Sequence, residues 1–401
     1  MALLPVEDAL ARILADARPK PAEIVPLAQA GGRVLAEDVV ARRHQPPFAA
    51  SAMDGYAVRA ADIANIPATL RVIGESAAGR RFDGPVGPGE AVRIFTGAPV
   101  PEGADTILIQ ENARRVDAGT LEALVATEAG RHIRRAGLDF TAGRTVLEAG
   151  RALDAGALSL AAAANCPSLP VHGQPAVAIL ATGDELVEPG MPPGPDQIVS
   201  SNNVGVAEIV RRAGGHPVDL GIARDSEAEI GAAIGRARDD GAEIIVTIGG
   251  ASVGDHDLVH KALTGQGMVL DFWKIAMRPG KPLMFGRLGE SFAIGLPGNP
   301  VSALVCAHLF LAPLVARLAG RAHADNMRDM RLGADMPANA DRQDYVRARA
   351  VPVDGEMVAT PLDLQDSSML SALAAANVLI VRPPKASPAR KDDACRVLVL
   401  R

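Results

Sequence analysis

Short apolar strands alternate with helical segments over residues 175–318, and this alternation constrains the fold more than any other feature of the sequence. The strands are predicted at residues 177–181, 218–222, 243–248 and 292–295. Helical patterns follow them at 204–213, 228–238, 258–263 and 301–318. Strands that alternate with helices form a parallel sheet with crossover connections, so we predict a doubly wound parallel-sheet α/β domain.

The rest of the 401-residue chain predicts further domains around this one. Residues 46–139 combine β-rich runs with Gly-Pro turns, which predicts a β-rich insert domain. Ala-rich segments at 20–45 and 140–173 flank the insert and are assigned to a linker domain. Helix-spaced apolar residues near the N-terminus predict an amphipathic helix, so residues 1–19 are grouped with 174–324. β patterns return after residue 325 and predict a small β-barrel over 325–401.

Composition excludes several classes of protein. The formal net charge of −6 argues against a nucleic-acid-binding protein, which normally carries a basic excess. No stretch of 18 apolar residues is free of charges, Gly and Pro, which argues against a membrane protein. The N-terminus lacks the basic region of a signal peptide, and the three cysteines are far apart in the sequence. We therefore expect a cytoplasmic protein without disulfides or a cysteine-based zinc site.

Glycine-rich and polar loops follow the predicted strands of the α/β domain. The third strand runs into VTIGGASVGDHD (residues 246–257), where Gly249, Gly250 and Gly254 would let the backbone approach a ligand and Ser252 could contact it. An isolated turn of this kind could equally be structural. The other strands end in ATGDEL (181–186), GIARDS (221–226) and GLPGNPVSA (295–303), the last of which supplies Pro297, Gly298, Asn299 and Ser302. Because ligands bind beyond the carboxyl ends of parallel strands, four such loops at one edge predict a pocket.

Acidic residues near this pocket suggest a metal ion. Carboxylates beside a phosphate site repel the ligand unless a cation lies between them, so Glu185, Asp225 and Asp257 favour Mg²⁺ or another divalent ion bridging to a phosphate. Helix N-capping is the alternative for each acid, and it is our interpretation of Asp255. We interpret His256 and His260 as polar surface residues.

A compact basic loop, FWKIAMRPGKP (272–282), supplies three cations. Lys274, Arg278 and Lys281 surround a Pro-Gly turn, and two or three such charges could hold a small oxyanion. A solvated loop is the structural alternative. The segment PPFAASAMDGYAVR (46–59) is also dense in special residues, although from physical chemistry alone it could be structural.

Six motifs together resemble the molybdopterin molybdenumtransferases of the bacterial MoeA type, which are related to the E domains of gephyrin and of plant molybdenum insertases. The motifs are SAMDGYAVR, IFTGAPVPEGADTI, ATGDEL, GGASVGDHD, AMRPGKP and GLPGNPVSA, in this order. The resemblance implies a four-domain homodimer whose α/β domain is similar to the molybdopterin adenylyltransferases. It also implies a divalent-metal-dependent reaction of adenylylated molybdopterin with molybdate that releases AMP and leaves molybdenum on the dithiolene.

The resemblance assigns roles to residues of this sequence. Six acidic or hydroxyl-bearing positions match catalytic positions of the family: Asp54, Thr96, Asp139, Glu185, Asp225 and Asp257. Asp225 and Asp257 would hold the metal. Lys274, Arg278, Lys281, Arg347 and Ser367 match positions that bind substrate or molybdate. In the dimer, Asp54 and Thr96 would reach the pocket of the neighbouring subunit.

The sequence departs from the family pattern at three places. Ala49 and Ala50 replace Asp-Asn before SAMDGYA, Ser200 stands where Asp is common, and Asp366 replaces a glycine beside Ser367. The last change adds a negative charge next to the expected oxyanion site. Two alternatives to the transferase are a molybdopterin adenylyltransferase, which would also be a transient partner of the transferase, and a gephyrin-like scaffold. The matched acids and basic loop favour a catalytic chain over a scaffold.

Overall fold

The computed structural model describes residues 3–250, 258–322 and 326–400. It divides into two compact units. The first contains residues 1–23, 32–36 and 171–401, and the second contains residues 24–31 and 37–170. Ser252, Gly254, Asp255, His256 and Asp257 lie outside the described residues.

A six-stranded mixed sheet forms the centre of the first unit. Its order is β16 (His216–Ala223), β13 (Ala176–Thr182), β17 (Ile244–Ile248), β21 (Ser291–Leu296), β20 (Met284–Leu288) and β18 (Val269–Trp273). The first four strands are parallel, which confirms the predicted α/β domain. Strand β20 pairs antiparallel with β21, and the edge strand β18 pairs antiparallel with β20; neither strand was predicted.

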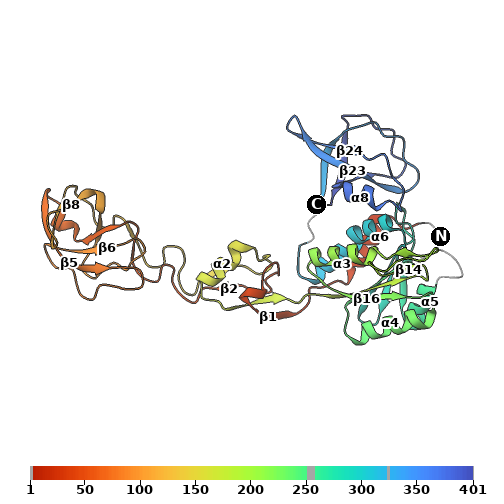
Figure 1. The fold of residues 1–401 in the computed structure, drawn as a ribbon, viewed down its shortest axis with the longest axis horizontal. Coiled ribbons are helices and arrows are strands. Elements are labelled where there is room, and N and C mark those ends of the chain that lie inside the picture. Colours follow the sequence, from red (N-terminus) through yellow and green to blue (C-terminus); the bar gives the residue numbers. More distant parts are fainter. Residues whose placement is uncertain (1–2, 251–257, 323–325, 401) are drawn as a thin grey trace. The chain divides into compact units, whose positions relative to one another are not determined.

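Helices cover both faces of this sheet. On one face lie α1 (Val6–Ala15), α3 (Asn202–Ala213) and the continuous helical segment α6 (Pro300–Cys306), η4 (Ala307–Leu311, a π-helix) and α7 (Ala312–Leu318). On the other face lie α4 (Glu227–Asp239) and α5 (Leu258–Gly265), as Figure 1 shows. The amphipathic helix predicted near the N-terminus is confirmed, since Val6, Ala9 and Ile13 are buried.

The helical segment Pro300–Leu318 is long and apolar enough to cross a membrane by length and composition. However, 67% of it is buried inside the protein, where it supplies much of the core. Its hydrophobicity is therefore explained by packing.

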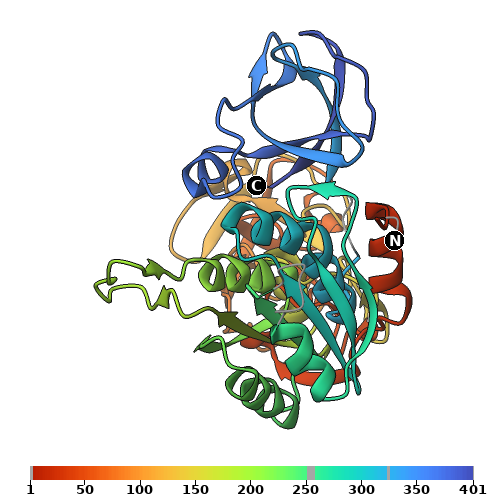
Figure 2. The ribbon, with the colours of Figure 1, turned by 90° about the vertical axis from the view of Figure 1, so that its right-hand side faces the viewer.

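A closed five-stranded barrel follows near the C-terminus. Its ring order is β23 (Gln343–Val353), β24 (Glu356–Pro361), β22 (Met327–Leu332), β26 (Ala394–Val399) and β25 (Val378–Arg382), with β25 pairing back to β23 (Figure 2). This confirms the predicted β-barrel. A short strand, β19 (Met277–Arg278), pairs with β23 of the barrel. The helix α8 (Leu370–Ala375) lies between β24 and β25 in the chain.

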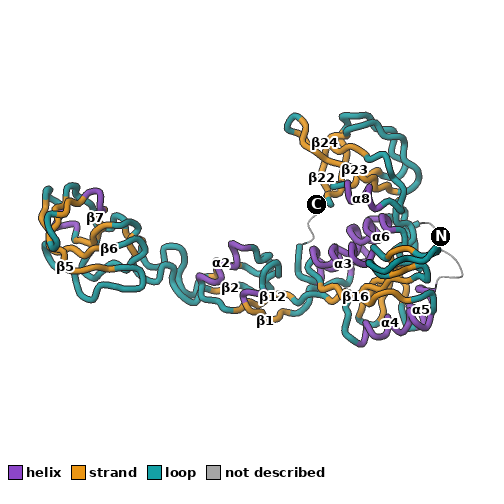
Figure 3. Tube along the Cα trace, viewed as in Figure 1, coloured by secondary structure: helices purple, strands orange, loops and turns teal. Residues whose placement is uncertain are grey.

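The second unit is made mostly of strands and loops (Figure 3). One six-stranded sheet has the order β7 (Thr106–Ile109), β4 (Gly55–Val58), β6 (Glu90–Ile94), β5 (Ala68–Ser76), β9 (Thr120–Ala123) and β8 (Ala113–Arg115). Two separate two-stranded sheets lie in the same unit. In one, β3 (Ala50–Ser51) pairs with β10 (Ile133–Arg134), and in the other, β2 (Val39–Val40) pairs with β11 (Thr145–Leu147). The unit also contains α2 (Ala155–Ala163) and the short 3₁₀ turns η1 (Leu27–Gln29), η2 (Ala60–Ile63) and η3 (Gln110–Asn112). Strands β1 (Ala22–Pro26) and β12 (Ser168–His172) pair with each other.

Candidate functional site

The carboxyl ends of the four parallel strands open into one cavity of about 670 Å³, which we call the sheet-edge cavity. The loops after β13, β16, β17 and β21 all contribute to its lining. Their predicted site residues in this lining are Glu185, Asp225, Gly249, Gly250, Pro297, Gly298, Asn299 and Ser302. The structure therefore brings the four predicted loops together.

Gly249 and Gly250 adopt left-handed conformations, with φ of 99° and 62°. A Cβ atom at Gly249 would lie 2.6 Å from the carbonyl oxygen of Thr182, and one at Gly250 would lie 2.4 Å from Val259 Cγ2. Both the conformation and the space thus require glycine. The buried strand β17 ends in two glycines because the turn that they form packs directly on the end of β13.

The described lining of the sheet-edge cavity carries acidic but no basic side chains. Glu185 and Asp225 are its charged residues, and Asp225 N donates a hydrogen bond to Asp184 Oδ1 at 3.3 Å. In residues 3–250, 258–322 and 326–400, no three His, Cys, Asp or Glu side chains are grouped as a metal site. Two carboxylates nevertheless suit Mg²⁺, which commonly takes one or two protein carboxylates and completes its shell with phosphate and water.

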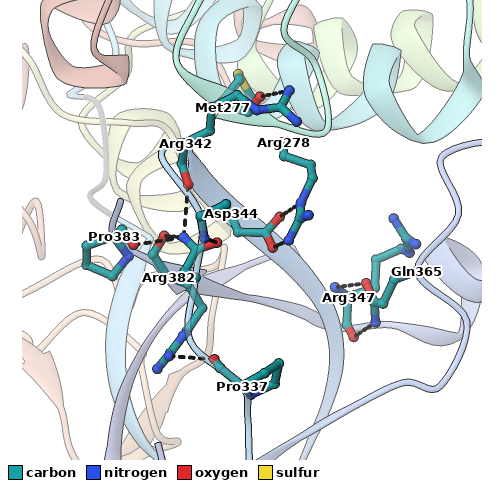
Figure 4. A network of polar contacts seen from close by, with 11 residues as sticks. Met277, Arg278, Pro337, Arg342, Asp344, Arg347, Gln365, Arg382 and Pro383 are labelled. Carbon is teal, nitrogen blue, oxygen red and sulfur yellow. Dashed lines mark hydrogen bonds and ion pairs between the residues drawn. The ribbon is translucent and has the colours of Figure 1, made fainter. Parts of the chain in front are cut away.

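A second cavity, of about 650 Å³, adjoins the first, since Pro282 and Ser302 line both. We call it the basic cavity. Five cations line it, together with three acids: Arg278, Lys281, Arg342, Arg347 and Arg382 against Asp335, Asp344 and Asp366. β19 and the loop that follows it supply the first two cations, and strands or loops of the barrel supply the other three. Figure 4 shows the arginines and their partners.

The cations of the basic cavity differ in how far their charge is already balanced. Arg278 donates two hydrogen bonds to the Asp344 carboxylate, and these raise the pKa of Arg278. Arg342 and Arg382 donate to backbone carbonyls, including those of Met277 and Pro337. The Lys281 side chain forms no hydrogen bond or ion pair with another described residue, and Lys281 lines the cavity.

Arg347 is a buried cation that forms no ion pair with a described residue, although the charges of Asp366 and Asp344 act on it. It is 1% exposed, and its guanidinium donates to the carbonyl oxygens of Leu364 (3.2 Å) and Asp366 (3.1 Å). Its Nε has no hydrogen-bond partner among the described residues. Burial lowers the pKa of Arg347, because desolvation disfavours the charged form. A buried unpaired cation is costly, so this group suits an anionic ligand.

Ser367 and Asp366 lie beside this arginine. Ser367 accepts a hydrogen bond from Asn299 Nδ2 at 3.0 Å on its Oγ, and its carbonyl accepts one from Val301 N. The Asp366 carboxylate accepts bonds from Ser368 Oγ (2.6 Å) and Ser368 N (2.8 Å), which lower the pKa of Asp366. The extra negative charge noted in the sequence is thus held in a local turn.

Lys274 does not join the lining of either cavity in the described structure. Its backbone has φ of 98°, and its Nζ lies 5.9 Å from the centroid of the Trp273 ring. Of the three cations predicted from FWKIAMRPGKP, Arg278 and Lys281 therefore meet at one cavity and Lys274 lies outside it.

Asp54 and Thr96 contact each other in the second unit. One oxygen of the Asp54 carboxylate accepts bonds from Thr96 N at 2.7 Å and Thr96 Oγ1 at 2.8 Å, and these bonds lower the pKa of Asp54. Asp139 is exposed, and its backbone N donates to Gln45 O.

Sequence reasoning missed Arg342, Arg382, Thr182 and Asn202, all of which line one of the cavities. Arg382 ends β25 and Thr182 lies within ATGDEL, so a systematic search of strand ends would have found these two. Arg342 and Asn202 carry no such signal.

Comparisons with known proteins match three consecutive parts of the chain. Residues 4–165 match the MoeA N-terminal region (domain I and II), residues 178–317 a probable molybdopterin binding domain, and residues 329–400 the MoeA C-terminal region (domain IV).

Individual relatives agree over most of the length. A molybdopterin molybdenumtransferase of Haemophilus influenzae is 36% identical over 90% of each chain, and molybdopterin molybdenumtransferase 2 of Mycobacterium tuberculosis is 42% identical over 72% of this chain and 73% of that one. The crystal structure of a molybdopterin biosynthesis MoeA protein from Pyrococcus horikosii covers both chains fully, with 28% identity and a TM-score of 0.84.

Proposed function

Because the chain belongs to the MoeA family of molybdopterin molybdenumtransferases, we propose that it uses molybdate and adenylylated molybdopterin as substrates and releases AMP. In this reaction water attacks the pterin-side phosphorus of the phosphoanhydride, the P–O bond to AMP breaks, and AMP leaves with its electron pair. Molybdenum binds the two dithiolene sulfurs, whose two protons leave with one molybdate oxygen as water. The product is the molybdenum cofactor.

The observation that carries the proposal is the buried, unneutralised guanidinium of Arg347 in the basic cavity. A dianion at about 4 Å from one cation gains on the order of 8 kcal/mol at an effective dielectric of 20, before desolvation. Arg347 and Lys281 would bind molybdate, and Ser367 would add a hydrogen bond to one of its oxygens. Arg278 contributes less because Asp344 already balances its charge.

The sheet-edge cavity suits the adenylylated part of the substrate. Gly249 and Gly250 allow close approach of a phosphate, while Glu185 and Asp225 would hold Mg²⁺ or another divalent ion, with Asp257 added from the sequence. When bound, such an ion would neutralise charge on the leaving phosphate. The two cavities adjoin at Ser302, so one substrate can reach molybdate in one cavity with its phosphates in the other.

We also propose a cytoplasmic homodimer in which Asp54 and Thr96 serve the cavity of the second copy, with Asp139 as a further catalytic acid. Lys274, Ser252 and Gly254 stay assigned to substrate binding by the resemblance. A molybdopterin adenylyltransferase would be a transient partner that supplies the substrate.

The test is AMP release from adenylylated molybdopterin by the purified chain, with and without molybdate and with Mg²⁺ or EDTA. Molybdate-dependent release that EDTA stops supports the proposal. An intact chain that releases no AMP under any condition would favour a scaffold, and consumption of ATP in its place would favour the adenylyltransferase.

A further inference from the structure

A third cavity, of about 670 Å³, lies in the first unit, and we call it the helix–barrel cavity. Helices α1 and α3 and the helical segment Pro300–Leu318 line it together with strands β22, β23, β25 and β26 of the barrel. Within the described lining it shares Tyr345 with the basic cavity and no residue with the sheet-edge cavity. The proposed reaction uses none of the residues that line it, so its presence needs a separate explanation.

Much of the lining of the helix–barrel cavity is aliphatic. Side chains from both helices, the helical segment and the barrel contribute, among them Val6, Leu10, Ile209, Leu309, Met327 and Leu398. A cavity of several hundred Å³ with an apolar wall and few polar groups is typical of a site for a small organic ligand.

The charged side chains of this lining are mostly basic. In the described chain they are Arg212, Arg321 and Arg396 against one acid, Glu7. Arg321 donates hydrogen bonds to the backbone carbonyl oxygens of Arg212, at 2.7 Å, and Gly32, and it forms no ion pair with a described residue. Burial lowers the pKa of Arg321, because desolvation disfavours its charged form. A partly buried guanidinium that is balanced only by carbonyl dipoles suits an anionic group.

His308 adds a neutral donor to the same lining. It lies in the π-helical turn Ala307–Leu311, and such turns are rare and often occur at functional sites. Burial, with a smaller effect of the nearby Arg212 charge, lowers the pKa of His308 to about 4, so near pH 7 its imidazole is neutral and carries one N–H donor. The imidazole forms no hydrogen bond with another described residue. Because Arg212 acts on His308 and its carbonyl binds Arg321, these polar groups gather in one part of the cavity.

We propose that the helix–barrel cavity binds a monocarboxylate with an unbranched apolar chain. Arg321 and the N–H of His308 hold the carboxylate, and the chain lies along the aliphatic wall. A carboxylate fits because the planar guanidinium can bind both of its oxygens through parallel N–H donors. The proposal is independent of the proposed function, since it involves neither molybdate nor the pterin.

The experiment is calorimetric titration of the full chain with three probes of equal chain length, octanoate, 1-octanol and octylammonium. We expect octanoate to bind with a Kd below about 1 mM and the other two to bind at least about tenfold more weakly. Decanoate should bind about fifteenfold more tightly than octanoate, since each CH₂ that enters an apolar cavity strengthens binding about fourfold.

Variants of the polar groups test where the carboxylate binds. Arg321→Gln removes the charge and His308→Leu removes the N–H, and each should weaken octanoate about fivefold or more while changing 1-octanol by less than about twofold. Arg317→Gln and His216→Leu are the matched controls, because both residues are exposed and lie outside the described lining. They should leave octanoate binding unchanged.

A variant of the wall tests where the chain binds, and it does not depend on the fold tolerating a change at His308. Ala312→Leu adds three carbon atoms to a side chain that lines the cavity, so it should weaken octanoate and decanoate alike. Three results would overturn the proposal: no binding of octanoate to the wild type, equal binding of octanoate and 1-octanol, or unchanged octanoate binding in both Arg321→Gln and Ala312→Leu.

Discussion

The guanidinium of Arg278 and the carboxylate of Asp344 form a two-pronged ion pair, with Nε 3.0 Å from Oδ1 and a second hydrogen bond to Oδ2. The pair is set by strand register, because Arg278 on β19 lies opposite Asp344 on β23. Its consequence is an uneven distribution of positive charge: of the four arginines of the basic cavity, Arg278 is neutralised by a carboxylate, whereas Arg342, Arg347 and Arg382 form no ion pair among the described residues.

Removing the carboxylate of this pair should strengthen oxyanion binding. Asp344→Asn leaves Arg278 in place and removes one negative charge from the cavity lining. We expect molybdate to bind about threefold to tenfold more tightly at low salt, and the gain to shrink as salt screens the charges. Calorimetric titration with molybdate at two ionic strengths measures this. Weaker binding in Asp344→Asn would show that Asp344 holds Arg278 in its binding position.

Replacing Arg347 should weaken molybdate binding without lowering the stability of the fold. Arg347→Met removes a buried charge and fills its volume with an apolar side chain, so we expect molybdate affinity to fall at least tenfold while the free energy of unfolding changes by no more than about 1 kcal/mol or rises. Arg349→Met on the same strand is the control, since Arg349 is exposed and should not affect binding. Normal molybdate affinity in Arg347→Met would contradict the assignment of the oxyanion site.

The α/β domain could be predicted because its signal is local. Four apolar strands separated by helical patterns specify parallel pairing, and parallel pairing places the loops after these strands at one edge. Strand β20 escaped prediction because Gly286, Arg287 and Gly289 mask its β pattern, and β18 because Asp271 interrupts its apolar run. Gly286 is required there, since a Cβ would lie 2.5 Å from the carbonyl oxygen of Val269 on the paired strand.

The basic cavity was less predictable because its residues meet only through tertiary structure. The sequence shows Arg278 and Lys281 near each other, but Arg342 and Arg382 come from distant barrel segments. The partner of a charge is equally hidden: nothing in the local sequence indicates that Asp344 binds Arg278 or that Lys274 lies over Trp273.

Asp54 offers a test of function in the second unit. Asp54→Asn weakens the hydrogen bonds that its carboxylate accepts from Thr96, and we expect turnover to fall at least tenfold with little change in thermal stability. Asp117→Asn is the matched control, because Asp117 is also an aspartate in a bend whose carboxylate accepts a backbone bond, here from Gly119. Because the pKa of Asp54 is lowered in the folded state, the contact persists as pH falls to the ordinary range of an aspartate and is lost only below it. Equal turnover in both variants would contradict a role for Asp54.

If Glu185 and Asp225 hold the metal ion, removing one of these carboxylates should raise the Mg²⁺ concentration that AMP release requires. Asp225→Asn should raise the Mg²⁺ concentration needed for half-maximal AMP release about tenfold or more, because one anionic ligand is lost. Glu188→Gln, which changes an exposed acid outside the described cavity lining, should leave the midpoint unchanged. A Mg²⁺ titration of AMP release gives both values, and an unchanged midpoint in Asp225→Asn would exclude it as a ligand.

The largely buried side chain of His308 should make the stability of the first unit depend on pH. It lies in the π-helical segment Ala307–Leu311, and burial, with a smaller effect of Arg212, lowers its pKa to about 4. In the unfolded chain the pKa is about 6.5, so between these values the unfolded state binds a proton that the folded state excludes. Stability contributed by neutral His308 is therefore complete above pH 6.5 and is lost as pH falls toward 4, by roughly 2–3 kcal/mol between pH 7.5 and 4.5. His308→Gln should flatten the fall of melting temperature over this range, whereas His216→Gln, at an exposed histidine, should not. Parallel curves for the wild type and His308→Gln would show that His308 titrates alike in the folded and unfolded chain.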